Sequence, residues 1–316
     1  FSPFLNSLLF FGLVFIASDI LSLPFDYYST FVIEEKYGFN KTTLATFFSD
    51  KLIAYLLSLL VGGGLLLVFL WLIHTMGPNF WWQFWIIASV FMVLVNVGYT
   101  AWIIPLFNTL TPLAEGEVRD KLLQYAAKVN FSVKHIFVMD GSRRSAKANA
   151  FFSGLGKQKK VVLYDTLLEQ HPPEELVAVL AHEIGHYKKK HLKWGMLVSV
   201  VEVGLLLFLL GQVVFSETMS LALGGTTLSV PLNIIGFTML FAPLSMVMGI
   251  GMNWLSRKHE FEADAYAKET FGGKPLAEAL KTLSVKSLST IHPHPWYVFV
   301  NYSHPPLLER LERLEQ

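Results

Sequence analysis

The sequence predicts a mainly α fold, a multi-pass transmembrane helical bundle or barrel that carries a small α+β cytosolic domain. Three observations predict this class. Of the 316 residues, 53% are hydrophobic and only 16% are charged, against about 25% charged residues in an ordinary soluble domain. Five apolar runs are each long enough to cross a bilayer, and all 25 Lys and Arg residues lie in the segments on one side of them. We therefore expect lipid to cover much of the apolar surface.

The five predicted spans contain no Lys or Arg, and each reaches the roughly 20 residues that a helix needs to cross the hydrocarbon layer. The first contains Asp19 and the fourth contains Glu202. A charge at that depth usually faces a bundle interior or a watery cavity, although either residue can equally lie near a helix end or pair with a neighbouring helix. The spans are residues 4–24, 52–73, 80–104, 194–215 and 230–255.

The distribution of basic residues predicts the orientation. Positively charged loops stay in the cytosol, so we expect the polar segments to be cytosolic. The predicted domains are transmembrane helices over 1–104, a cytosolic segment over 105–193, two transmembrane helices over 194–255 and a cytosolic helical segment over 256–316.

The cytosolic segments have recognisable elements. Short runs rich in Val, Ile and Phe predict strands at 135–139 and 161–164, with 149–152 between them as part of a small sheet. Pro172 and Pro173, followed by two acidic residues, predict the start of a helix that continues to about residue 190. Further helices are expected at 117–129, at 256–267 as a continuation of the fifth span, and at 275–288 after Gly272 and Gly273.

Composition limits the chemistry that these elements can carry. The sequence contains no Cys, so disulfides and thiolate ligands are excluded, and a metal ion must be bound by His, Asp or Glu. The net charge is only +1, which argues against a nucleic-acid partner.

The helix that begins near Pro173 contains His182-Glu183-Ile184-Gly185-His186. Two imidazoles four residues apart share one helix face and can bind one ion, and Glu183 is placed to take a proton from an attacking water. A five-residue pattern in which only three positions are specified also occurs by chance. The location favours zinc ligation, because three titratable groups in an otherwise apolar helix are costly to bury without such a role. For His191 and the lysines before it, we expect only a solvated helix end.

Catalytic zinc usually has three protein ligands and an open position, so a third ligand is required. The best candidate is Glu260, with Asp264 one turn further on the same helix face. Asp264 is placed to hold the outer nitrogen of a ligand His. The alternative is an exposed charged helix face, and we expect His259 and Glu262 to point elsewhere.

With these motifs the chain resembles the type I CAAX prenyl proteases, integral-membrane zinc metalloendopeptidases of the gluzincin type that cleave the C-terminal tripeptide of prenylated substrates. The similarity runs over nearly the whole chain as an ordered set of motifs. They are residues 31–40, 104–107, 141–145, Asn149-Ala150, 161–168, 182–186, 260–264 and 302–306.

The resemblance implies one Zn²⁺ per chain with His182, His186 and Glu260 as ligands, and Glu183 as general base. It also implies that Asn149, Ala150 and His304 position the scissile peptide or its oxyanion, and that Arg310 contacts substrate. From the residues alone, Asn149 fits an edge strand that can pair with a peptide, and His304 fits a helix entrance. Members of this family form a barrel of seven helices around a water-filled chamber, so we expect N-terminal helices before Phe1 or one uncounted span.

The sequence therefore predicts peptide hydrolysis by a small α+β zinc-protease domain in the lipid bilayer. The resemblance implies a peptide or prenylated protein C-terminus as partner, and a location in the endoplasmic reticulum membrane of a eukaryote or the inner membrane of a bacterium. The second candidate is a membrane quality-control protease similar to the HtpX group, which shares the zinc helix and a comparable glutamate motif. A third, from another class, is a membrane scaffold in which zinc is only structural. A closed site with four ligands would support the scaffold, and the sequence offers no convincing fourth ligand.

Overall fold

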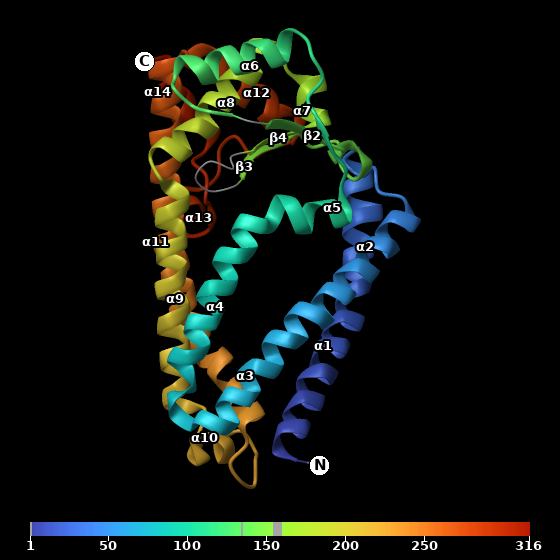
Figure 1. Cartoon of the computed structure of the whole chain (residues 1–316), viewed down its shortest axis with the longest axis vertical. Coiled ribbons are helices and arrows are strands. Elements are labelled where there is room, and N and C mark those ends of the chain that lie inside the picture. Colours follow the sequence, from blue (N-terminus) through green and yellow to red (C-terminus); the bar gives the residue numbers. More distant parts are fainter. Residues whose placement is uncertain (1, 134, 154–159) are drawn as a thin grey trace. The chain divides into compact units, whose positions relative to one another are not determined.

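The computed structural model describes residues 2–133, 135–153 and 160–316. It is mostly helical with one four-stranded sheet, which confirms the predicted mainly α class (Figure 1). Two compact units alternate along the chain. The first comprises Phe1–Val95 and Met196–Ser245, and the second comprises Asn96–Gly195 and Met246–Gln316.

The first unit consists of helices. Its helix α3 ends at Met76 and is followed by Gly77, which has a φ of +55° that glycine adopts without strain. Pro78 follows, and α4 then runs back from this turn alongside α9 (Figure 1). The Nε1 atom of Trp85 on α4 donates a 2.7 Å hydrogen bond to the carbonyl of Val200 on α9. The elements are α1 (Pro3–Tyr28), α2 (Leu44–Leu57), α3 (Gly63–Met76), α4 (Phe80–Gly98), α9 (His191–Val213), α10 (Glu217–Ala222) and the first part of α11 (Val230–Thr270).

Within the residues that the structure describes, four helical stretches are long and apolar enough to cross a membrane, where five spans were predicted. The predicted second and third spans both lie in one stretch of 64 residues, Leu44–Phe107. At 1.5 Å per residue this stretch is about three times as long as the hydrocarbon layer is thick. The turn at Gly77–Asn79 divides it, so the count differs because that turn is itself helical.

Asp19 pairs with a neighbouring helix, which was one of the two alternatives for this residue. Its Oδ2 atom accepts a 2.5 Å hydrogen bond from the hydroxyl of Tyr55 on α2, and its Oδ1 atom is 3.6 Å from Nζ of Lys51. Lys51 also donates to Asp26 at 2.7 Å. These contacts join α1 to α2 through charges that would be costly to leave unpaired in an apolar region.

The second unit contains the sheet, in the order β1-β2-β4-β3. Strands β2 and β4 are parallel, and β3 pairs antiparallel with β4 at one edge. The three predicted strands are confirmed with boundaries shifted by one residue at most, whereas β1 was missed because it is short and contains Pro112. The strands are β1 (Leu110–Pro112), β2 (His135–Met139), β3 (Ala150–Ser153) and β4 (Lys160–Tyr164).

Helices α6, α8 and α12 pack together next to this sheet (Figure 1). The core is centred on α8, whose Leu176, Leu180 and Ile184 side chains are completely buried. Burial on almost every side explains why this helix is apolar around its circumference rather than along one stripe. The helices are α5 (Ile104–Phe107), α6 (Glu117–Lys128), α7 (Asp165–Gln170), α8 (Pro173–Lys188), the end of α11, α12 (Gly273–Lys286), α13 (Pro295–Asn301) and α14 (Leu307–Glu315).

Candidate metal centre

Helices α8 and α11 approach each other closely at Gly185. A Cβ atom at this position would lie 3.0 Å from both the Cα and the carbonyl oxygen of Ala263 on α11. Only glycine therefore fits this contact without displacing one of the helices. Gly185 lies between the two motif histidines in the sequence, and Glu260 on α11 reaches both of them.

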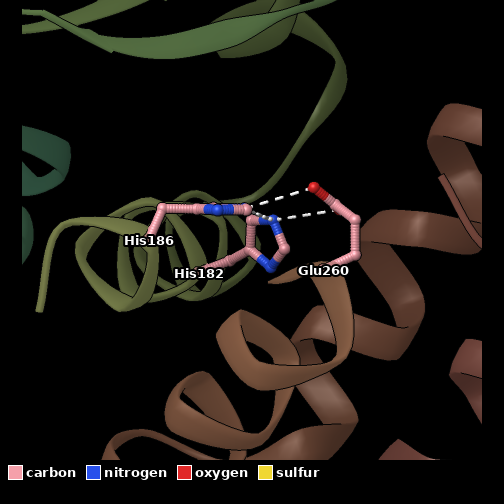
Figure 2. A group of neighbouring side chains, drawn as sticks. All are labelled: His182, His186 and Glu260. Carbon is pink, nitrogen blue, oxygen red and sulfur yellow. Dashed lines mark hydrogen bonds and ion pairs between the residues drawn. The ribbon is translucent and has the colours of Figure 1, made fainter. Parts of the chain in front are cut away.

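His182, His186 and Glu260 converge on one point, as Figure 2 shows. The Nε2 atoms of the two histidines are 3.1 Å apart. Glu260 places Oε2 at 3.5 Å from Nε2 of His182 and Oε1 at 3.2 Å from Nε2 of His186. One potential ligand atom from each residue lies within 4.8 Å of the other two. Two imidazoles and a carboxylate are a donor set that zinc prefers.

The other ring nitrogen of His182 faces Asp264. The distance from Nδ1 of His182 to Oδ1 of Asp264 is 2.8 Å, and Asp264 is buried with 2% exposed. A carboxylate at this position fixes the tautomer of a metal-binding histidine and increases its basicity. Burial lowers the pKa of His182, but the hydrogen bonds that its ring donates to the Asp264 and Glu260 carboxylates outweigh this and raise the pKa to about 9.

Arg310 completes the charge balance around these acids. Its Nε and Nη2 atoms donate to the two oxygens of Asp264 at 2.7 and 2.6 Å, and Nη1 is 3.4 Å from Oε2 of Glu260. The side chain is buried, with 8% of the residue exposed. Its predicted contact with substrate stays a prediction, because the contacts seen here are with the two carboxylates.

Glu183 is half-buried beside the converging side chains. Burial raises the pKa of its carboxyl group, and the neighbouring His182 and His186 partly oppose that shift. A pKa moved towards neutrality suits a group that must accept and then return a proton near neutral pH.

His304 lies at the exposed side of the site. Its Nε2 atom is 3.6 Å from Oε1 of Glu260, and 66% of its side chain is exposed. Its Nδ1 atom is 3.0 Å from the hydroxyl of Ser303. Although His304 is 44 positions away from Glu260 in the sequence, the fold brings the two together. Its predicted role at the scissile peptide stays a prediction.

Asn149 and Ala150 lie where the edge strand β3 begins. Asn149 is exposed, and its Oδ1 atom accepts a 2.8 Å hydrogen bond from the amide of Ala150. In the described part of the chain, no hydrogen bond or ion pair connects these two residues with the converging histidines. Their link to the site is the strand edge, which is open to a further strand in the described residues.

The expectation of a solvated helix end at His191 is wrong. His191 is buried with 6% exposed. Its Nδ1 atom is 3.0 Å from Nδ1 of His186, and its Nε2 atom is 2.9 Å from Oε2 of Glu262. His259 stacks on its ring with centroids 3.9 Å apart. His259 and Glu262 do point away from the converging ligand atoms, as expected, but they pack against a residue that contacts a candidate ligand.

Comparisons with known families cover nearly the whole chain in two parts. Residues 112–316 match the model of peptidase family M48. Residues 1–109 match a model described as the CAAX prenyl protease N-terminal region with five membrane helices.

Similar proteins come from distant organisms. A CAAX prenyl protease 1 homolog of Oryza sativa subsp. japonica is 40% identical over 98% of this chain and 73% of its own length. CAAX prenyl protease 1 of Saccharomyces cerevisiae is 37% identical over 98% of this chain and 72% of its own length. The crystal structure of S. mikatae Ste24p superposes with a TM-score of 0.93 at 36% identity, covering 100% of this chain and 77% of that one.

Proposed function

The chain belongs to peptidase family M48 and carries the membrane-helix region of the CAAX prenyl proteases, and on this premise we propose that it is a zinc endopeptidase that cleaves prenylated proteins near their C-terminus. It is a multi-pass membrane metalloprotease. The identity of the metal, the substrate and the roles of individual residues are the proposal. The convergence of His182, His186 and Glu260 is the observation that carries it.

The proposed metal is zinc, with His182, His186 and Glu260 as its ligands. A Zn²⁺ ion at such a site polarises a peptide carbonyl and makes nearby water more acidic. Glu183 accepts the proton of the attacking water as the new C–O bond forms, and gives it to the leaving amine as the C–N bond breaks. Burial, which raises the pKa of Glu183, supports both halves of this role.

Substrate recognition is assigned to the strand edge and the exposed histidine. An extended peptide that adds to the edge of β3 would make main-chain hydrogen bonds there, with Asn149 and Ala150 at its start. The exposed ring of His304, which lies beside Glu260, can donate to the oxygen that becomes negatively charged. A contact of Arg310 with the substrate is part of the proposal, and in the structure its side chain contacts the carboxylates of Asp264 and Glu260.

The membrane location supports a lipid-modified substrate. A prenyl chain partitions into the bilayer, so an enzyme with membrane spans meets such proteins at the surface. We place the site on the cytosolic side because all 25 Lys and Arg residues lie in segments assigned to that side. In a eukaryote this is the endoplasmic reticulum membrane, and in a bacterium the inner membrane.

The match of residues 1–109 to the CAAX-type N-terminal region favours this function over the HtpX-like alternative. Membership of a peptidase family disfavours a scaffold with purely structural zinc. A prenylated peptide distinguishes the proposed function from both alternatives. An HtpX-like enzyme would prefer an unfolded membrane protein to this peptide, and a scaffold would cleave neither substrate.

The test uses purified protein and a farnesylated C-terminal peptide, with the same peptide lacking the farnesyl group as control. We expect cleavage of the farnesylated peptide, inhibition by a chelator and recovery on addition of Zn²⁺. Glu183→Gln should keep the metal, because its side chain is not a ligand, but lose at least about 100-fold in rate. Full activity of that variant would remove Glu183 from the mechanism, and cleavage resistant to chelation would overturn the zinc proposal.

A further inference from the structure

The second ring nitrogen of His186 contacts another histidine. His182 presents its Nδ1 to a carboxylate, but Nδ1 of His186 lies 3.0 Å from Nδ1 of His191. The opposite nitrogen of His191, Nε2, is 2.9 Å from Oε2 of Glu262 on α11. A chain of hydrogen bonds therefore runs from His186 through a buried imidazole to Glu262.

The protons in this chain can be assigned from the chemistry of the rings. When Nε2 of His186 gives its lone pair to a cation, a neutral His186 carries its proton on Nδ1. That proton is donated to Nδ1 of His191, so a neutral His191 carries its own proton on Nε2 and donates it to Glu262. With both rings neutral, this is the arrangement in which every hydrogen bond has one donor and one acceptor. It is also the arrangement that leaves Nε2 of His186 free.

The backbone bends to place His191 in this position. In an uninterrupted helix, a residue five positions after His186 would be turned about 140° away around the axis. Helix α8 instead ends at Lys188, and Lys190 adopts a left-handed φ of +63° before α9 begins at His191. A residue other than glycine in this conformation costs about 1–3 kcal/mol. The surrounding structure maintains a strained turn whose effect is to direct His191 back to His186.

Neighbouring side chains fix the ring of His191. The imidazole of His259 stacks on it with an interplanar angle of 9° and a centroid distance of 3.9 Å. Nζ of Lys258 lies 3.9 Å from Oε1 of Glu262 and leaves Oε2 to His191. The acceptor for His186 is thus held in place by contacts on its face and at its far nitrogen.

We propose that His191 is a positioning residue, which accepts the Nδ1 proton of His186 and, together with Glu262, holds that ring in the tautomer and orientation in which Nε2 faces the metal. The inference rests on the proposed metal site. Partners of this kind usually change metal affinity by 10- to 100-fold when they are removed. The Nδ1 atoms of the two candidate ligands would then have different hydrogen-bond partners, a carboxylate for His182 and a neutral imidazole for His186.

The test measures Zn²⁺ affinity of the full-length protein in detergent by competition with a chelator, and the visible spectrum of the Co²⁺-loaded protein. His191→Phe removes the acceptor but keeps a flat ring, and we expect a 10- to 100-fold loss of Zn²⁺ affinity with a changed Co²⁺ spectrum. His191→Asn places an amide oxygen close to the position of Nδ1. We expect this variant to stay within about threefold of the unmodified protein.

His171→Phe is the matched control. His171 is also buried, with 5% exposed, and also pairs with a carboxylate, Glu175, at 2.7 Å, but it is remote from the ligands at the start of α8. We expect unchanged Zn²⁺ affinity and an unchanged Co²⁺ spectrum in this variant. If His191→Phe fails to fold, Glu262→Leu and Glu262→Gln replace it, since only Gln keeps an acceptor for Nε2 of His191.

The outcomes separate this inference from the proposed function. Loss of affinity in His191→Phe, recovery in His191→Asn and no effect in His171→Phe would support the positioning role. Unmodified affinity and spectrum in His191→Phe, or equal losses in all three variants, would overturn it while leaving the zinc site intact. If the unmodified protein itself binds no Zn²⁺, the proposed function fails first.

Discussion

Arg310 is central to the charge balance of the site. Two buried carboxylates, Asp264 and Glu260, lie next to it, and three of its nitrogens contact their oxygens. A buried charge without its partner is strongly destabilising, because neither water nor another group replaces the lost contact. In the metal-free protein, Arg310 is therefore expected to matter for stability as well as for the position of Asp264.

We predict that Arg310→Met destabilises the metal-free protein by about 3–5 kcal/mol, since it takes the guanidinium away from two buried carboxylates, Asp264 and Glu260, which then share the charge of His182. Arg313→Met is the control on the same helix. The exposed Arg313 stacks on Phe261 at 3.5 Å, and the loss of such a contact costs about 1 kcal/mol or less. The apparent melting temperatures in detergent measure the difference. Equal melting temperatures for the two variants would show that Arg310 does not stabilise this cluster.

Protonation of His182 predicts a pH dependence of metal binding. Its pKa in the metal-free protein is about 9, so at pH 7.5 the ring is charged and must lose a proton before Nε2 can bind a cation. Zn²⁺ affinity should therefore rise with pH up to about 9, by at most about tenfold per unit, and then level off. Calorimetry in buffers with different ionisation enthalpies should detect proton release at pH 7.5. Binding without proton release at that pH would contradict the assigned charge.

At the level of elements, the contact between α8 and α11 decides whether the ligands meet. Helix α8 presents two histidines on one face, and α11 extends from an apolar span into a polar segment that carries Glu260 and Asp264. Gly185 lets the two backbones approach. The contact thus converts two separate sequence motifs into one site.

Gly185→Ala tests this contact. Alanine favours a helix by about 1 kcal/mol over glycine, but its Cβ would lie 3.0 Å from backbone atoms of Ala263. We predict that the helices move apart and that Zn²⁺ affinity falls by about tenfold or more. Gly195→Ala on α9 is the control, because a Cβ there has no neighbour within 4 Å. Unchanged affinity in Gly185→Ala would mean that the close approach is not needed to form the site.

The sequence predicted the features of helices and strands that depend on the spacing of neighbouring residues. His182 and His186 share a face because helical residues four apart always do, and the strands at 135–139 and 161–164 follow from runs of β-branched residues. The sequence did not predict the role of His191. Nothing in a run of three lysines signals a left-handed residue at Lys190, and without that turn His191 points to a different side.

At the level of the whole molecule, the chain combines membrane helices with a polar unit whose parts are separated in sequence. Glu260 is 74 positions after His186, so no local rule could bring them together. The pairing could be predicted from coordination chemistry. A zinc ion held by two imidazoles requires a third ligand, and few acidic residues are available on a helix that leaves the membrane. The number of spans was less predictable, because a helical turn at Gly77 joins two of them.

The most direct test of the account is the zinc content of the purified protein, measured together with X-ray absorption at the zinc edge. We predict one zinc per chain, bound by two imidazole nitrogens and carboxylate oxygen with an open position. In Glu260→Ala, which keeps both histidines, the zinc content should fall close to zero after dialysis against a weak chelator. Unmodified protein without zinc, or a Glu260→Ala variant that retains a full equivalent, would contradict the account.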